Sequence, residues 1–336
     1  MLKLEARPEP SKLMSIMSPV LALAITVVIG TVLFMLLGKD PMRGLYVFFV
    51  EPLKSVYALT ELAMKATPLI LIALGLAVCF RSNVWNIGAE GQFVVGAIAA
   101  AGVAMTADKE TGRWIVAAVL AAGVLGGMLW AGIVAFLRDR FNANEILVSL
   151  MLVYVAQLIL DYLIRGPWRD PKGFNFPQSV PFDAEATLPL LLSSGRLHFG
   201  VIITLIVVVI AAIVFARTMF GYQVRVVGAA PRAAQFSGFR SGRLTYAVFA
   251  ISGALAGLAG VMEVSGQIGQ LQPSISPGYG FTAIIVAFLG RLSPVGILIG
   301  GLVLAVTYIG GEFAQVSLKI PQDMTRVFQG LLLMCV

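Results

Sequence analysis

The chain has 336 residues, of which 59% are hydrophobic and only 12% are charged, and its mean hydropathy is +0.92. Soluble domains do not carry this much apolar surface, so we predict an all-α polytopic membrane protein. The net charge of +7 does not indicate nucleic-acid binding, because the basic residues lie in loops between apolar runs, where membrane orientation accounts for them.

The two cysteines, Cys79 and Cys335, lie in or next to apolar runs. Their spacing matches neither a disulfide framework nor a zinc site, so we expect no metal site. The sequence also contains no HExxH motif, no plausible Ser-His-Asp set and no phosphate-binding GxxxxGK[ST] loop. We therefore predict no catalytic residues and no ATP hydrolysis by this chain.

Apolar runs about twenty residues long predict transmembrane helices. Residues 1–18 contain Lys3, Arg7 and Lys12 and are expected to be a cytoplasmic N-terminal segment, ahead of a run too long for a signal peptide. A single permease domain is expected over 19–336. The last run is only about twelve residues long, shorter than a bilayer requires, which leaves open whether the chain is truncated. Ten segments are expected to be helices: 19–38, 60–80, 87–106, 114–137, 145–164, 198–216, 244–264, 279–290, 294–311 and 325–336.

The second and third segments are separated by a polar break, RSNVWNIGAEGQ at 81–92. Lipid offers freed backbone amides no partner, so such a break lies where protein or an aqueous cavity covers it. We expect Asn86 to cap the following helix, and Asn86, Glu90 and Gln92 to line a polar path, as broken helices do in transporters. The alternative is that Glu90 only offsets the helix dipole and pairs with a neighbouring helix.

Loop charges predict the orientation. With the N-terminus in the cytoplasm, the 217–243 loop lies there too, and it carries five arginines and no acidic residue. Within it, Pro231 suits the first turn of a short exposed helix and Gly238 a stop. The 165–197 segment is too polar to span and is expected outside, as a docking surface or as a simple connector. His198, the single histidine, is expected to begin a helix after a loop, in a surface or interfacial role rather than as a proton relay.

Four stretches in chain order carry a family resemblance: NIGAEGQ at 86–92, NEILVSLMLVYVA at 144–156, GYQVRVVGAAPRAAQFSGF at 221–239 and GYGFTAIIVAFLGRLSPVGILIGG at 278–301. They resemble the permease subunits of bacterial ABC importers for nucleosides, within the family that also imports simple sugars and branched-chain amino acids. Ribose-type sugar permeases usually carry a GGIDLSVG-like stretch in place of NIGAEGQ, which favours the nucleoside branch. The chain is most similar to the longer of two paired permeases, but has Val153 before Tyr154 where related chains often have Asn.

The resemblance implies a ten-helix, vitamin-B12-permease-like importer in the bacterial cytoplasmic (inner) membrane. The implied partners are a shorter homologous permease, forming a heterodimer, a cytoplasmic ABC ATPase that holds ATP and Mg, and an external substrate-binding lipoprotein. This chain would need no cofactor of its own. By position, 228–239 would be the coupling helix to the ATPase, and its most motif-like residues are Gly228, Pro231, Arg232, Ala233 and Ala234.

The expected function is inward transport of nucleosides by alternating access. A mostly apolar path with a few amide and hydroxyl groups suits an uncharged solute, and the candidates are Asn86, Glu90, Gln92, Tyr154 and Gln157. Import of simple sugars or branched-chain amino acids is the main alternative. A second alternative is an ion-coupled secondary transporter acting through Glu90, Asp161 or Glu263, in which the 217–243 loop would have no evident use. A passive channel is disfavoured, because no filter or pore-ring pattern is present.

Overall fold

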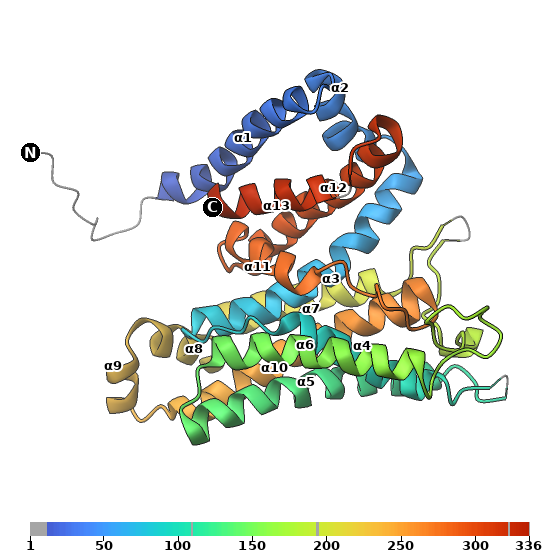
Figure 1. Ribbon diagram of the computed structural model, residues 1–336. Helices are drawn as coiled ribbons and strands as arrows, with labels where there is room; N and C mark the ends of the chain where they lie inside the picture. The colour runs from blue at the N-terminus through green and yellow to red at the C-terminus, as the bar shows by residue number, and fades with distance from the viewer. Residues whose placement is uncertain (1–11, 109, 193–194, 322, 336) are drawn as a thin grey trace, which may run out of the picture. The chain divides into compact units, whose positions relative to one another are not determined.

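The structure is a computed structural model that describes residues 12–108, 110–192, 195–321 and 323–335. The regular elements among these residues are all helices (Figure 1). Pairing of the β type is limited, in the same residues, to two isolated bridges, Arg169 with Ser179 and Leu190 with His198. The all-α prediction is therefore confirmed.

Each of the ten predicted apolar segments is helical. Six helices are long and apolar enough to cross a membrane within the described residues: α3 (Val56–Arg81), α5 (Ile115–Phe141), α6 (Glu145–Arg165), α7 (Gly200–Arg217), α10 (Ser241–Val261) with its extension η4 (Met262–Ile268), and α12 (Pro294–Leu318). Helices α4 (Ala89–Ala104), α11 (Tyr279–Leu289) and α13 (Asp323–Cys335), and the apolar part of α1 (Lys12–Leu36), are shorter. The expected count of ten crossing helices is thus not confirmed.

The first helix starts earlier than the sequence pattern indicates. Helix α1 begins at Lys12, inside the predicted N-terminal segment 1–18, and residues 1–11 of that segment lie outside the described residues. The hydropathy window missed this turn because it registers apolar length, whereas a helix also continues through polar residues at its ends.

One compact unit is formed by residues 1–55 and 306–336. It contains α1, α2 (Pro41–Leu45), the single turns η1 (Tyr46–Val50) and η2 (Glu51–Leu53), the second half of α12, and α13. Its core is aromatic: the rings of Phe48 and Phe328 stack with centroids 4.6 Å apart, and Phe34 lies 5.6 Å from Phe328. Asp40 caps α2 by accepting from the Met42 amide.

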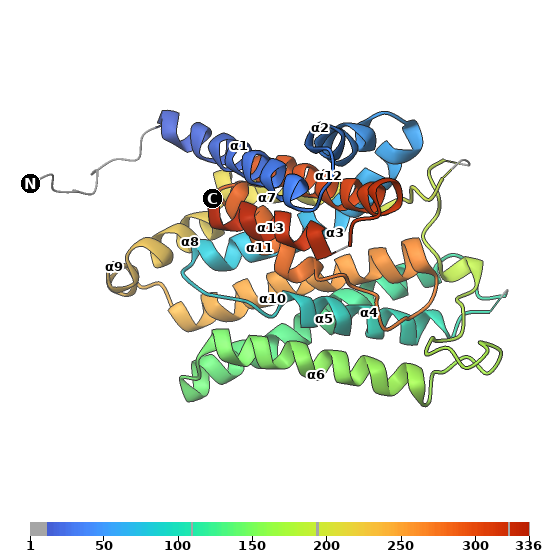
Figure 2. The ribbon, with the colours of Figure 1, turned by 45° about the horizontal axis from the view of Figure 1, so that its top comes forward.

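The second unit, residues 56–305, has α3 in its interior. Every residue of α3 from Ala66 to Phe80 is buried, as expected for a helix that is apolar on all sides. It packs against α7, α10 and α11, while α4 packs against α5, α6 and α10. Helix α6 lies at the edge of the bundle beside α4 and α5 (Figure 2), so one of its faces is left exposed.

Glycines set the closest helix contacts in this unit. A Cβ atom at Gly127 of α5 would lie 2.2 Å from the carbonyl oxygen of Gly253 in α10, and one at Gly96 of α4 would lie 2.3 Å from the Cα atom of Gly257. No side chain fits at these positions, so the backbones of α4, α5 and α10 touch directly. Glycine steps serve this kind of packing in membranes, where van der Waals contact rather than hydrophobic burial holds helices together.

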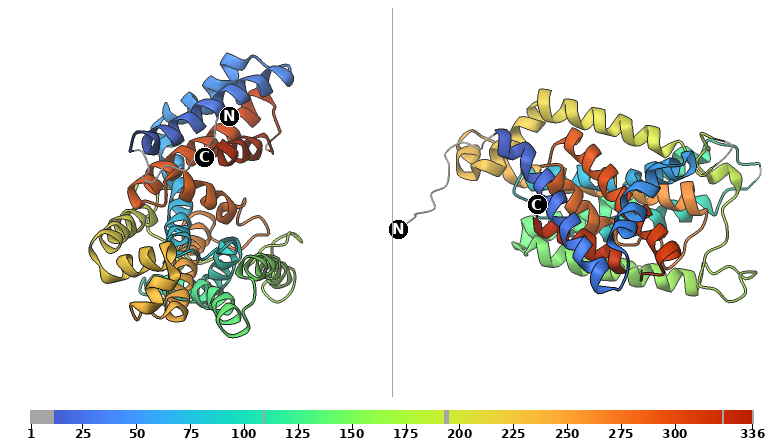
Figure 3. Two further views of the ribbon diagram at one scale, coloured as in Figure 1. Left: turned by 90° about the vertical axis from the view of Figure 1, so that its left-hand side faces the viewer. Right: turned by 90° about the horizontal axis from the view of Figure 1, so that it is seen from above.

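The connections of this unit gather at its two ends (Figures 1 and 3). One end holds the α5–α6 turn, α8 (Met219–Ala229), α9 (Pro231–Phe236) and the start of α10. We call it the arginine-rich end; its charged residues include Arg81, Arg138, Arg140, Arg217, Arg225, Arg232, Arg240 and Arg243, with Asp139 and Glu145. The opposite end holds the α4–α5, α6–α7 and η4–α11 connections, where acidic and basic residues are mixed.

The α6–α7 connection is tied to the segment that follows α10. The amides of Ser179, Phe182 and Leu188 donate to the carbonyl oxygens of Leu271, Gly269 and Ser265, at 3.0, 2.8 and 3.0 Å. This predicted external loop is therefore held along η4 and the residues after it, although it contains almost no regular structure.

Two side chains fix the end of the same loop. Arg196 forms a bidentate ion pair with Glu61 of α3, at 2.7 and 3.1 Å. His198 is buried rather than at the surface as the sequence indicates, and its Nδ1 accepts from the Gly200 amide at 3.0 Å. Burial favours the neutral imidazole and lowers the pKa of His198 to about 4.

Candidate functional site

Several backbone amides in the break between α3 and α4 donate to protein groups. Helix α3 ends with Asn83 in the left-handed region (φ 56°), which lets the Val84 amide donate back to the carbonyl of Cys79 at 3.0 Å. The Ile87 amide donates to the Ser149 hydroxyl of α6 at 3.2 Å. Protein groups thus satisfy the backbone where the helix is interrupted, as the low-dielectric environment requires.

Asn86 lies at the centre of a buried amide network. Its Nδ2 donates to Gln92 Oε1 and to Ser252 Oγ, both at 3.0 Å, and its Oδ1 accepts from Gln92 Nε2 at 3.1 Å. The same Oδ1 accepts from the Gly88 amide at 3.0 Å. Asn86 and Gln92 are 0% and 1% exposed, so the network joins α4 to α10 inside the protein.

The expectation that Asn86 caps the following helix is wrong. Helix α4 begins at Ala89, and its N-cap position is Gly88, which makes no side-chain cap. Asn86 stands two residues before the cap and bonds an amide ahead of the helix. An asparagine side chain that closes a turn on its own backbone competes with capping, and here the turn is the structure formed.

Glu90 faces a different neighbour from Asn86. Its carboxylate accepts from the Gly280 amide in the first turn of α11 at 2.6 Å, and it also bonds the hydroxyl of Ser276. Ser276 in turn accepts from the amides of Gly278 and Tyr279 at 3.1 Å. A carboxylate near the N-terminus of a helix stabilises the positive end of the helix dipole. Glu90 occupies this position for α11, and it also lies in the first turn of α4.

A lysine lies next to this contact. Lys65 of α3 donates to the hydroxyl of Tyr279 at 3.0 Å, and the Tyr279 ring packs edge-on against Phe93 of α4. Tyr279 is fully buried. The start of α11 is therefore held by one charged group from α3 and one from α4. Sequence reasoning missed the roles of Tyr279, Ser276 and Ser252, because nothing in their local sequence distinguishes them from other small or aromatic residues in apolar runs.

The five predicted path residues fall into two groups. Asn86, Glu90 and Gln92 are buried within this chain, whereas Tyr154 and Gln157 lie on the exposed face of α6, with 57% of Tyr154 accessible. The structure does not bring the two groups together in one cavity. A contact between them and a solute remains a prediction.

The predicted coupling region is two helices rather than one. Pro231 is the first residue of α9, and Gly238, with φ +80°, follows its end, as the sequence pattern predicts. Pro231, Arg232 and Ala233 are exposed, while Ala234 is buried at 1%. The placement of Gly228 in the same helix is wrong, because it belongs to α8.

Gly228 instead contacts the end of α3. A Cβ atom at this position would lie 1.9 Å from the carbonyl oxygen of Arg81 and 3.2 Å from the Cα atom of Ser82. Only glycine allows α8 to approach the break this closely. A second unpredicted feature is Phe236 on α9, whose side chain is 94% exposed.

Comparison with known proteins identifies the family. The family described as branched-chain amino acid transport system / permease component matches residues 58–336. This chain belongs to that family. The permease is 37% identical to the glucose ABC transporter permease protein TsgB13 of Haloferax volcanii over 327 residues, which cover 94% of this chain and 86% of the relative.

Two relatives are named as nucleoside transporters. The guanosine ABC transporter permease protein NupP of Bacillus subtilis is 28% identical to this permease, with 97% of this chain and 94% of the relative covered. The nucleoside ABC transporter permease protein NupB of Lactococcus lactis is 27% identical, with 94% and 89% covered. Each of these organisms also has a second similar permease, NupQ and NupC respectively. The chain is thus a multi-pass ABC transporter permease, a transport component rather than an enzyme.

Proposed function

We propose that this permease imports nucleosides by alternating access, as one half of a heterodimer with a shorter homologous permease. A cytoplasmic ABC ATPase would supply the energy by binding and hydrolysing ATP with Mg, and an external lipoprotein would deliver the substrate. The observation that carries the proposal is the contact of Gly228 with Arg81, which links the exposed helix α9 to the polar break through α8.

The contacts supply a mechanical sequence. Movement of the ATPase would press on α9, where Pro231, Arg232 and Phe236 are exposed, and α8 would transmit the displacement to the end of α3. The break follows directly, and from there Glu90 holds the start of α11. Packed helices move as units rather than deform, so a push at the arginine-rich end would reach the break and the start of α11 together.

The proposed orientation follows from the charges. Lysines and arginines are favoured on the cytoplasmic side, and the arginine-rich end carries eight arginines from α3 to α10 in the list above. With that end inside, the α6–α7 connection lies outside. Its backbone is fixed along η4 by hydrogen bonds, so it presents a constant surface on which an external lipoprotein could dock.

The proposed path lies between the two permeases. The exposed face of α6 carries Tyr154 and Gln157 among apolar residues, and such a mixture of one hydroxyl and one amide suits an uncharged, partly aromatic solute. Asn86, Glu90 and Gln92 are satisfied inside this chain in the described conformation, so they would reach the solute only if the break rearranges during transport.

Import of glucose or another simple sugar is the second candidate. It is favoured by TsgB13, the relative with 37% identity, which is named for glucose. NupP and NupB favour nucleosides. A nucleoside contains a sugar, so a path that binds sugar hydroxyls would suit both nucleosides and simple sugars. Contacts with the base would then decide between these two kinds of substrate.

The test is uptake of labelled guanosine, glucose and leucine into proteoliposomes that hold this permease with its co-encoded subunits, with and without ATP. We expect guanosine uptake that requires ATP and survives collapse of ion gradients. Arg232→Glu on α9 should abolish it, whereas the matched charge reversal Arg140→Glu, on α5 at the same end, should leave at least half. Uptake of glucose in place of guanosine would support the sugar candidate, and ATP-independent uptake driven by an ion gradient would overturn the ABC mechanism.

A further inference from the structure

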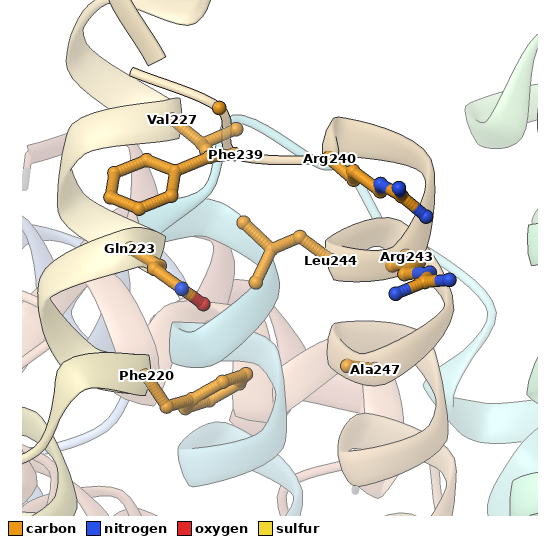
Figure 4. A pocket seen from close by; sticks show the side chains of 9 residues that line it. Phe220, Gln223, Val227, Phe239, Arg240, Arg243, Leu244 and Ala247 are labelled. Atoms are coloured by element: carbon orange, nitrogen blue, oxygen red, sulfur yellow. The ribbon is translucent and has the colours of Figure 1, made fainter. Parts of the chain in front are cut away.

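A pocket of about 480 Å³ lies between α8 and α10 at the arginine-rich end. Figure 4 shows Phe220, Gln223 and Val227 on α8 facing Leu244 and Ala247 on α10, with the Gly238–Phe239 turn closing one end. Neither the coupling mechanism nor the proposed path uses this space.

The end of the pocket beside the Gly238–Phe239 turn is cationic. Arg240 and Arg243 come from the start of α10 and are both exposed, and no carboxylate among the lining residues faces them. Neither forms an ion pair with any acidic residue in the described part of the chain. The acidic side chain of Asp139 on α5 lies against Gly242 at the start of α10. The amide of Gln223 points into the same space (Figure 4).

The other end of the pocket is apolar. Phe220 and Ala247 face each other there, beside the buried Leu244. Ala247 follows Arg240 by seven residues of helix, which corresponds to about 10 Å along α10, toward the middle of the membrane-spanning segment. Charge and hydrophobicity are thus separated along the direction in which a membrane lipid is oriented.

We propose that this pocket binds an anionic glycerophospholipid from the leaflet that meets the arginine-rich end. The phosphate lies between the Arg240 and Arg243 guanidinium groups, which match phosphate oxygens in geometry and charge, and an acyl chain packs on Phe220 and Ala247. A free phosphate or a nucleotide would leave the apolar end unused. The bound lipid contacts both α8 and α10, the two helices that flank α9 in the chain. The lipid composition of the leaflet therefore affects how firmly α9 is held.

Native mass spectrometry of the purified full-length permease tests the proposal, with dioleoyl phosphatidylglycerol and dioleoyl phosphatidylcholine as competing probes. We expect phosphatidylglycerol to be retained in preference. Each interfacial arginine strengthens binding to anionic lipid about fivefold, so the Arg240→Gln, Arg243→Gln double variant should lose about 30-fold in apparent affinity. The matched double variant Arg140→Gln, Arg217→Gln removes two exposed arginines of the same end that do not line the pocket, and should lose less than fivefold.

A second variant separates a lipid from a soluble anion. Ala247→Trp fills the apolar end and keeps both arginines, so phosphatidylglycerol binding should weaken at least fivefold while the elution volume in size exclusion stays unchanged. Glycerol phosphate at millimolar concentration should not displace the lipid. Displacement by glycerol phosphate, unchanged binding in Ala247→Trp, or equal losses in the two double arginine variants would each overturn the proposal.

Discussion

Replacement of Asn86 by alanine tests whether the amide network holds the polar break in place. Asn86 makes four hydrogen bonds, two with Gln92 and one each with Ser252 and the Gly88 amide. Only the bond to Ser252 joins two helices, and hydrogen bonds of that kind average about 0.6 kcal/mol in membranes. An orphaned buried polar group costs about 1–3 kcal/mol in soluble proteins, and the buried Gln92 amide would lose both of its bonds to Asn86. We expect a loss of about 2–4 kcal/mol in unfolding free energy.

The assay is SDS titration of the purified permease in mixed micelles, followed by circular dichroism. Gln157→Ala, which removes an exposed amide from α6, is the control and should change the unfolding free energy by less than about 0.5 kcal/mol. The Asn86→Ala, Gln92→Ala double variant should cost less than the sum of the two single variants, because both remove one network. A loss below about 1 kcal/mol for Asn86→Ala, or strict additivity in the double variant, would refute the reasoning.

Three further predictions use the same unfolding assay. Gly228→Ala should destabilise by about 1–3 kcal/mol, because its Cβ atom would lie 1.9 Å from a carbonyl oxygen of α3, whereas Gly132→Ala on α5 meets open space and should be neutral or slightly stabilising; equal effects would contradict the close contact. Glu90→Leu removes the acceptor for the first turn of α11 and should cost about 1–3 kcal/mol, whereas Glu90→Gln keeps an acceptor oxygen and should cost less than half of that; similar losses would argue against a role of the carboxylate oxygen. Burial holds the pKa of His198 at about 4, below its unfolded value of 6.5, because the folded protein favours the neutral imidazole. The neutral His198 therefore adds its full share to the unfolding free energy above pH 6.5, and this share, about 3 kcal/mol, is lost as the pH falls toward 4. His198→Asn should remove this part of the pH dependence of the unfolding free energy, and an unchanged profile in that variant would refute the assignment.

The sequence predicts the helices well because each apolar run is long and lies between polar residues. The glycines of the α5–α10 crossing, Gly123 with Gly127 and Gly253 with Gly257, are likewise spaced four residues apart, a pattern that permits close packing. Both features depend on neighbours within a few turns of the same helix. The α9 boundary is a similar case, since proline and glycine act on their own backbone.

The candidate site is harder to predict because its partners come from distant segments. Asn86 resembles a helix cap in local sequence, but Ser252, 166 residues away, and Gln92 occupy its amide instead. Gly228 resembles part of the PRAA helix, yet its position is set by contact with the end of α3. His198 is polar and follows a loop, but its ring is buried against Gly266 of η4. In each case tertiary packing decides between local alternatives of similar energy.

The glycine contacts among α4, α5 and α10 leave these three helices little freedom to slide, because backbone meets backbone without side chains that could change rotamer. They therefore form a natural fixed frame for measuring motion. Spin labels on the exposed face of α5 and on α10 should keep a constant separation through a transport cycle, while labels on α9 or α6 report displacement against them. Distances measured from α5 or α10 to labels on the other helices would therefore show which helices move during transport.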